Sequence, residues 1–187
     1  DLVAFAQLHN LKIGTIRDLI AYRRRHDHLV TKVRDVPFVS DYGGDWRLLT
    51  YRNKVDGTEN FVLQKGRVVA GEPTLTRVHS VSLFADMLGQ PGPRKCALQR
   101  AMTEVGRAGA GVIVLLVPPT VEKPARGDSG DGAEPDMDLR SYGIGAQILA
   151  DLGVQEMILL TNAHRNIVAI EGYGINIVGE RPIPSEI

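Results

Sequence analysis

The sequence predicts a mixed α/β fold (α+β mixed), with a β-rich front half of short antiparallel strands and a back half in which helices and strands alternate. Between residues 30 and 81, four short segments rich in apolar and β-branched residues are separated by turn signals such as Asp56-Gly57, a pattern typical of antiparallel neighbours. After residue 95, segments of helical periodicity alternate with apolar runs of strand length. Such alternation implies crossover connections and a sheet that is at least partly parallel.

The front half is expected to hold four strands. The first covers Val30–Phe38, where Pro37 indicates an edge or a bend, because proline cannot donate to a ladder of hydrogen bonds. The other three are expected at Trp46–Tyr51, Asn60–Leu63 and Leu75–Val81.

The back half begins with an amphipathic helix over Lys95–Ala108, in which Cys96 is one of the apolar residues at helical spacing. The uninterrupted apolar run Val112–Val117 predicts a strand buried on both faces. The remaining expected elements are a helix at Ser141–Leu152, a strand at Met157–Leu160, a short helix at Asn166–Glu171 and a last strand at Ile175–Val178.

Residues 1–28 and 29–187 are expected to be two different units. The first contains a helix over Asp1–Leu8 and a second helix after Thr15 that ends at the basic run Arg23–His26, where cations suit the helix dipole. Because the chain begins at Asp1 without an initiator Met, it is expected to be a piece of a longer protein. Within the second unit, residues 121–137 are rich in Gly, Pro and acids without an apolar period, which predicts a mobile loop.

Composition excludes several classes of function. The formal net charge of zero excludes a general nucleic-acid binder, which needs a basic surplus. No apolar run approaches the roughly 18 residues of a membrane span. The single cysteine, Cys96, excludes an internal disulfide and fits a reducing, cytoplasmic location. It also excludes any zinc site that uses two or more thiolates of one chain.

Three motifs together resemble the GTP cyclohydrolase II family: Arg77-Val78-His79-Ser80, the segment Asp138–Leu149, and Leu160-Thr161-Asn162. Residues 1–28 resemble the C-terminal end of 3,4-dihydroxy-2-butanone 4-phosphate synthase, which in many bacteria precedes the cyclohydrolase on one chain. The resemblance implies a GTP cyclohydrolase II-like fold for residues 29–187. It also implies a synthase domain as the partner before residue 1, synthase activity for the full-length chain, and a homodimer.

The resemblance also implies a chemistry and a set of site residues. Family members open the guanine ring of GTP with a zinc ion held by three thiolates, and Mg²⁺ assists at the triphosphate. Asp138 and Arg140 match the catalytic motif. The alternative is a helix start, which explains Asp138, because an acid suits the dipole there, but explains Arg140 less well, because a cation does not. The residues implied for nucleotide binding are Arg77, His79, Ser80, Tyr142, Thr161 and Arg165.

The sequence departs from this pattern at several of the required positions. Val81 and Ser82 stand where the family has an acid and the first zinc cysteine, and Cys96 supplies at most one thiolate. Pro118-Pro119 and the acidic loop replace the family's Gln-Glu-Gly-Arg loop. We therefore predict no bound cofactor and an inactive domain, regulatory or dimer-stabilising, that retains a cleft for a nucleotide or flavin-related ligand. The alternatives are an active cyclohydrolase that uses Mg²⁺, or a rebuilt metal site from Cys96, His79 and Asp86, which no spacing pattern links.

Overall fold

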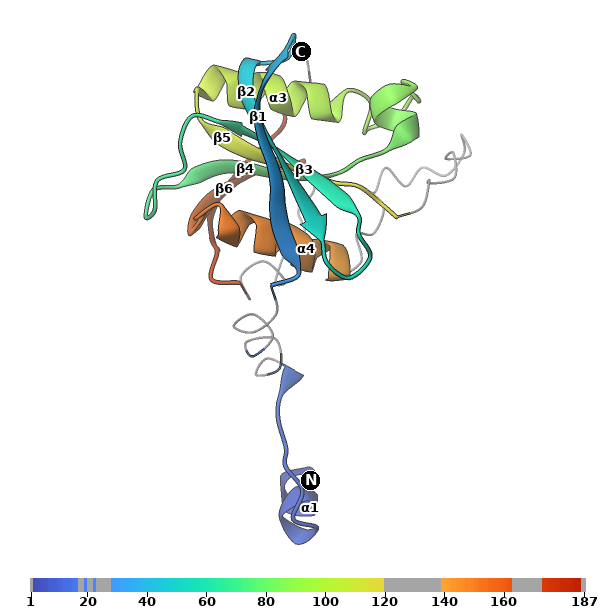
Figure 1. Ribbon diagram of the computed structural model, residues 1–187, viewed down its shortest axis with the longest axis vertical. Helices are drawn as coiled ribbons and strands as arrows, with labels where there is room; N and C mark the ends of the chain where they lie inside the picture. Colours follow the sequence, from blue (N-terminus) through green and yellow to red (C-terminus); the bar gives the residue numbers. More distant parts are fainter. Residues whose placement is uncertain are drawn as a thin grey trace.

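Seven strands form one sheet in the order β1-β2-β3-β5-β4-β6-β7 (Figure 1). The computed structural model describes residues 2–16, 19, 22, 28–119, 139–162 and 173–185, with only the backbone of 139–142. The strands are β1 (Val30–Ser40), β2 (Gly44–Asn53), β3 (Glu59–Lys65), β4 (Thr74–Ser80), β5 (Gly111–Leu116), β6 (Glu156–Leu160) and β7 (Asn176–Arg181). Pairing is antiparallel from β1 through β3 to β5 and parallel among β5, β4, β6 and β7. The predicted mixed α/β architecture is confirmed.

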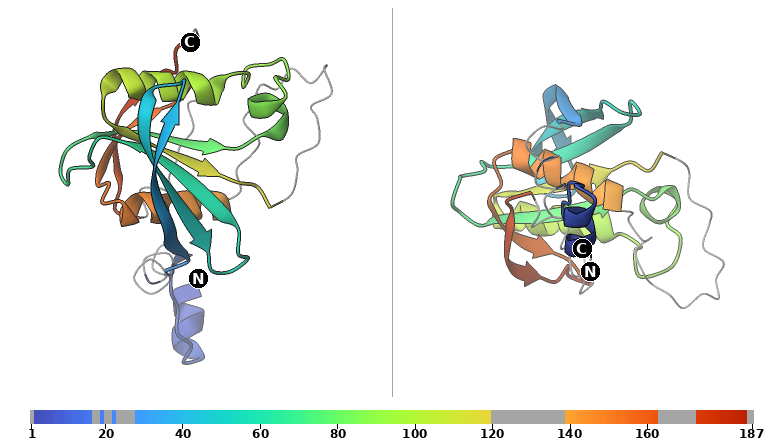
Figure 2. Two further views of the ribbon diagram at one scale, coloured as in Figure 1. Left: turned by 45° about the horizontal axis from the view of Figure 1, so that its top comes forward. Right: turned by 90° about the horizontal axis from the view of Figure 1, so that it is seen from below.

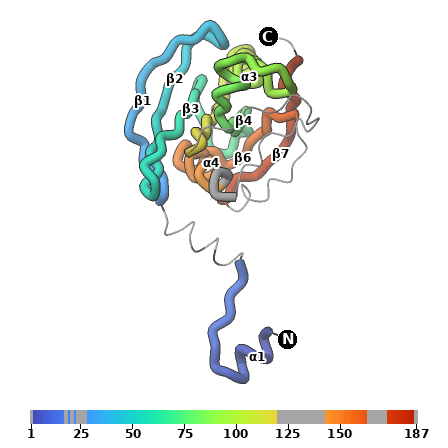
Figure 3. Tube along the Cα trace, turned by 90° about the vertical axis from the view of Figure 1, so that its right-hand side faces the viewer, coloured from blue at the N-terminus to red at the C-terminus, as the bar shows by residue number. Residues whose placement is uncertain are grey.

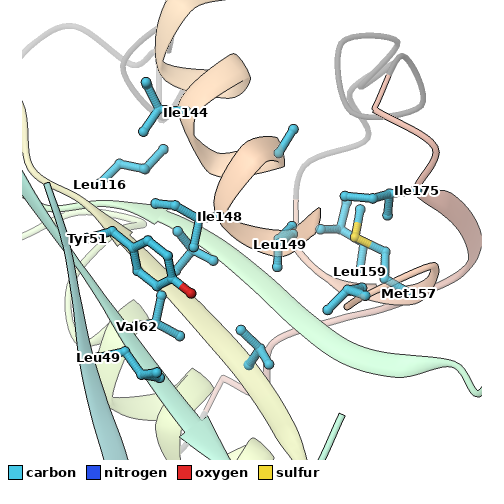
Figure 4. Packing of buried hydrophobic residues seen from close by; sticks show 14 residues of the cluster. Leu49, Tyr51, Val62, Leu116, Ile144, Ile148, Leu149, Met157, Leu159 and Ile175 are labelled. Atoms are coloured by element: carbon cyan, nitrogen blue, oxygen red, sulfur yellow. The ribbon is translucent and has the colours of Figure 1, made fainter. Parts of the chain in front are cut away.

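Two helices cover opposite faces of the sheet, α3 (Ala97–Ala108) on one side and α4 (Leu139–Asp151) on the other (Figure 2). Each helix lies over its own apolar core. Figure 4 shows the α4-side core, in which Tyr51, Val62 and Ile148 are fully buried. The α3-side core contains Trp46 and Ile113. Strand β5 contributes alternate residues to both cores, so the predicted burial of both its faces is confirmed.

Strand β1 is the outermost strand on its side of the sheet, as the proline within it predicts. Pro37 pairs with Arg47 of β2, and the register shifts between Lys32 and Arg34. A side-chain ion pair between Asp35 and Arg47 adds to the contact between the two strands. Proline, a bulge and charged side chains are the usual features that keep an edge strand from pairing with another chain.

The turn between β1 and β2 packs against α3 at two glycines. A Cβ on Gly106 of α3 would lie 2.5 Å from the Cα of Gly43, so neither position has room for a side chain. Lys65 fixes the same turn: its Nζ donates to the carbonyl oxygen of Gly43 at 2.5 Å and to that of Asp45 at 2.7 Å. The ammonium group also lies 5.0 Å from the ring centroid of Trp46.

Some elements differ from the sequence-based expectation. Helix α3 begins at Ala97 rather than Lys95, because Cys96 has a left-handed φ of 57° that a helix cannot include. The short π-helix η1 (Leu83–Met87) was not predicted. The predicted loop at 121–137, the predicted helix at 166–171 and most of the second predicted helix lie outside the described residues.

Helix α1 (Leu2–Leu8) lies apart from the sheet (Figure 3). In residues 2–22, nine large apolar side chains are exposed, from Leu2 to Tyr22, and Leu8 is 80% exposed. The segment therefore presents an apolar surface that the described part of the domain does not cover. In the described residues, no helix combines the length and the apolar character that a membrane crossing requires.

Candidate functional site

The carboxyl ends of the parallel strands form one edge of the sheet, and this edge is the candidate site. Strand β4 ends at Ser80, whose partner in the register is Leu116 at the end of β5. Strand β6 runs parallel to β4 and ends at Leu160. Helix α4 lies over the same ends, as the close approach of Gly145 shows: a Cβ on this residue would be 3.4 Å from Val78 and 3.6 Å from Leu116. Ligands of open α/β sheets bind outside these carboxyl ends.

Strand β4 divides the predicted nucleotide-binding residues between the two faces of the sheet. Arg77 pairs with Ile113, which belongs to the α3-side core, and His79 follows two residues later on the same face. Ser80 pairs with Leu116, which belongs to the α4-side core. Because side chains alternate along a strand, Arg77 and His79 point toward α3 and Ser80 toward α4. The motif therefore does not form a single binding surface.

Arg77 is an interior cross-link between two strands. Its side chain is almost inaccessible, with the residue 3% exposed. Its Nη1 donates to the carbonyl oxygen of Leu160 at 3.0 Å and so ties β4 to the end of β6. Its Nη2 lies 3.3 Å from Nδ1 of His79. Because a guanidinium group can only donate, Nδ1 of His79 must accept this hydrogen bond.

His79, 1% exposed, joins β4 to η1. Its Nε2 lies 2.8 Å from Oδ2 of Asp86, and because Nδ1 accepts from Arg77, Nε2 carries the proton and donates. The same carboxylate oxygen accepts the backbone N–H of Ser82 at 2.8 Å. The Ser82 hydroxyl accepts the backbone N–H of Ala85 at 3.2 Å, which caps η1.

Asp86 is a buried carboxylate that several donors keep ionised. Burial alone raises its pKa, but the hydrogen bond and the charge interaction with His79, the N–H of Ser82 and the nearby charge of Arg94 outweigh burial, so the pKa lies below its ordinary value. Helix α3 also contacts this residue, since Nε2 of Gln99 donates to the backbone carbonyl oxygen of Asp86 at 3.2 Å.

These contacts do not fit a zinc site. Both ring nitrogens of His79 have hydrogen-bond partners, the Ser82 hydroxyl caps η1, and Cys96 is the only cysteine of the chain. In the described part of the chain, no three His, Cys, Asp or Glu side chains are grouped to hold a metal ion. Zinc takes four ligands from such groups and water. The rebuilt site from Cys96, His79 and Asp86 therefore gains no support.

The structure describes only two of the other predicted site residues in full, Ser80 and Thr161. Ser80 is half-buried, and its carbonyl oxygen accepts from Nη2 of Arg94 at 2.7 Å. Thr161 is half-buried beyond the end of β6, and its N–H donates to the carbonyl oxygen of Arg181 at 2.9 Å. Four residues lie outside what the structure describes: Asp138 and Arg165 entirely, and Arg140 and Tyr142 apart from their helical backbone at the start of α4.

The sequence analysis missed the partners that hold this edge together. It considered Asp86 only as a metal ligand and did not consider Arg94 or Gln99. The available signal was strand alternation: Arg77 and His79, at i and i+2 of one strand, lie on the same face, and polar groups that are buried there require partners. A carboxylate a few residues downstream is the natural candidate for that partner.

Comparisons with known proteins agree with the resemblance found in the sequence. A model of the GTP cyclohydrolase II family matches residues 31–182. The chain is similar to "Riboflavin biosynthesis protein RibBA" of Aquifex aeolicus, with 38% identity over 206 residues that cover 100% of this chain and 50% of that protein. It is also similar to the RibBA protein of Bacillus cereus strain ATCC 14579, with 36% identity over 207 residues, 98% of this chain and 50% of that protein.

Among solved structures, the chain is similar to RibBX of A. baumannii, described as a two-domain 3,4-dihydroxy-2-butanone 4-phosphate synthase. The TM-score is 0.63 and the sequence identity is 27%, with coverage of 100% of this chain and 49% of that chain. The chain therefore spans about half the length of the curated relatives it matches.

Proposed function

Because the chain belongs to the GTP cyclohydrolase II family, we propose that it is a riboflavin-biosynthesis domain that no longer opens the guanine ring and serves as a regulatory or dimer-stabilising domain. One observation carries this proposal: the polar groups at the end of β4 bond to one another. His79 donates to Asp86 and accepts from Arg77, and the Ser82 hydroxyl caps η1. Because these side chains are engaged with one another, they do not form a group of ligands for a metal ion.

The chemistry explains why such a loss ends the reaction. Ring opening in this family, as the resemblance implies, begins with attack by a zinc-bound water. Zinc lowers the pKa of that water to roughly 7 and so supplies hydroxide near neutral pH. Ser82 in place of a thiolate removes a ligand of that zinc, and Pro118-Pro119 in place of the family's Gln-Glu-Gly-Arg loop removes a second part of the mechanism.

The N-terminal segment supports the proposed place of this domain in a longer protein. Its exposed apolar side chains, nine in residues 2–22 of the described chain, need a covering surface. The relatives extend to about twice the length of this chain. We propose that a synthase domain precedes residue 1 and that residues 1–28 are its helical end. We also propose that residues 29–187 are the cyclohydrolase-like domain and that the full-length protein has synthase activity.

We propose that a nucleotide or flavin-related ligand binds on the α4 side of the sheet. Ser80 points toward α4, whose first turn carries Arg140 and Tyr142. Thr161 follows the neighbouring strand β6. We also propose that the protein is a homodimer. A thermal-shift comparison with GTP, pyrophosphate and flavins distinguishes the ligand classes, since a specific ligand raises the melting temperature.

Metal content and turnover test the loss of activity. We expect full-length protein, purified with zinc in the medium, to hold no stoichiometric zinc and to release no formate from GTP, with or without added Mg²⁺. Formate added in a known amount checks that the assay detects the product. One zinc ion per chain together with formate and a ring-opened pyrimidine product would establish the alternative, an active GTP cyclohydrolase II.

A further inference from the structure

Arg77, His79 and Asp86 form a hydrogen-bonded set, called here the buried polar network. We infer that this network holds the carboxyl end of β4 to its neighbours, in the region where the family resemblance implies a metal ion. The inference rests on the proposed absence of metal and goes beyond it, because it names the groups that hold this end of β4 in place without one. It also assigns a protonation state to His79 that can be measured.

The network joins four elements at one point. Arg77 on β4 reaches the carbonyl oxygen of Leu160 on β6 at 3.0 Å. His79 reaches Asp86 on η1 at 2.8 Å. Gln99 on α3 reaches the backbone carbonyl oxygen of Asp86 at 3.2 Å. Hydrogen bonds therefore connect the carboxyl end of β4 to β6 and η1, and connect η1 to α3.

The network contacts the two segments, η1 and the first turn of α3, that carry the ligand positions given by the resemblance. The resemblance gives metal-ligand positions to Ser82, at the start of η1, and to Cys96, at the start of α3. Oδ2 of Asp86 binds the N–H of Ser82 at 2.8 Å. The backbone of Asp86 is held by Gln99, which lies in the turn of α3 that follows Cys96. Asp86 thus connects both positions without a metal.

The geometry leaves no ligand set for an added ion. Nδ1 of His79 lies against Nη2 of Arg77 and Nε2 against Oδ2 of Asp86, so both ring nitrogens are already engaged in hydrogen bonds. Oδ1 of Asp86 and Oε1 of Gln99 are the buried oxygens here that find no donor among the described residues. Two oxygens are fewer than the four ligands that zinc requires.

Thermal unfolding of the full-length protein tests the network against a metal. We expect EDTA and added zinc to leave the melting temperature of this domain unchanged. Asp86→Ala leaves two buried donors without an acceptor and should lower the melting temperature by roughly 5 °C or more, with or without zinc. Glu72→Ala, at an exposed acid, is the matched control and should have no effect. A melting temperature that falls with EDTA, or an Asp86→Ala protein that melts like the control, would overturn the inference.

Side-chain nitrogen NMR of the unmodified full-length protein keeps the inference testable even where Asp86→Ala does not fold. The signal of His79, assigned by its loss in His79→Gln, should show the neutral Nε2–H tautomer, unchanged by EDTA or zinc. A metal-bound nitrogen, a proton on Nδ1 or a charged ring at neutral pH would refute it. Failure of the proposed function shows separately, as formate release from GTP.

Discussion

Tyr51 shows at the scale of one residue how the sheet fixes α4. The residue has no exposed surface, and its hydroxyl donates to Oδ2 of Asp151 at 2.7 Å. Asp151 is the last residue of α4, where a negative charge opposes the helix dipole. The hydrogen bond compensates for this charge and joins β2 to the end of the helix.

Replacing the hydroxyl therefore has a predictable cost. Tyr51→Phe should lower the free energy of unfolding by about 1 kcal/mol, since Asp151 is exposed and regains water. That loss corresponds to about 2–4 °C in melting temperature. Tyr42→Phe, at an exposed tyrosine, is the matched control and should leave the melting temperature unchanged. Equal effects of the two substitutions would contradict the assigned role.

The pH dependence of the same two proteins supplies a second readout of this prediction. Burial, followed by the hydrogen bond to Asp151, raises the pKa of Tyr51. In the unfolded chain a tyrosine ionises near pH 10. Above that pH the unfolded state loses a proton that the folded state keeps, so stability falls as the pH rises. Tyr51→Phe should remove this part of the alkaline destabilisation, and Tyr42→Phe should not.

At the scale of an element, α3 depends on the backbone contact between Gly43 and Gly106. Gly106→Ala would place a Cβ 2.5 Å from the Cα of Gly43, so the helix or the turn must move. We expect a loss of about 1–3 kcal/mol, measured by urea unfolding. Gly145→Ala in α4 is the control, because its Cβ would meet only side-chain atoms, at 3.4 and 3.6 Å.

The control should behave in the opposite direction. Alanine has the higher helix propensity, by roughly 1 kcal/mol, so Gly145→Ala should be neutral or stabilising. If both substitutions destabilise the protein equally, the close approach of the turn to α3 is not what requires a glycine at position 106.

The elements differ in how far the sequence could predict them, for physical reasons. The apolar run of β5 indicates burial on both faces without knowledge of its neighbours, and Pro37 indicates an edge, because both signals are local. Cys96 sits at helical spacing, but its left-handed φ depends on the preceding turn. The five-residue π-helix η1 is too short to show an apolar period.

The candidate site was less predictable than the fold. The motif residues Arg77 and Ser80 could be found in the sequence, but their division between the two faces follows from the strand that carries them. The partners of His79 come from η1 and from Arg77 itself, and the bonds that close the edge depend on where β6 and α3 lie. Strand alternation indicates that Arg77 and His79 share a face, but it does not indicate which groups of β6 and α3 meet them there.

At the scale of the whole molecule, the apolar surface of residues 2–22 and the half-length match to the relatives support the proposal that this domain lies beside another. A dimer-stabilising role predicts that full-length protein cut after His28 loses synthase activity at low protein concentration. Its dimer should dissociate at a higher concentration than the dimer of the intact protein. The comparison requires synthase assays and sedimentation of both proteins over the same range of concentrations.

Adding the separate domain, residues 29–187, to the cut protein distinguishes two reasons for such a loss. A domain that stabilises the dimer through its own surface should restore activity when added in excess, because the contact is non-covalent. If activity returns only when the two parts are on one chain, the linker itself transmits the effect. Equal activity and equal dimer dissociation before and after the cut would remove the dimer-stabilising role, since 29–187 would then contribute nothing to the synthase.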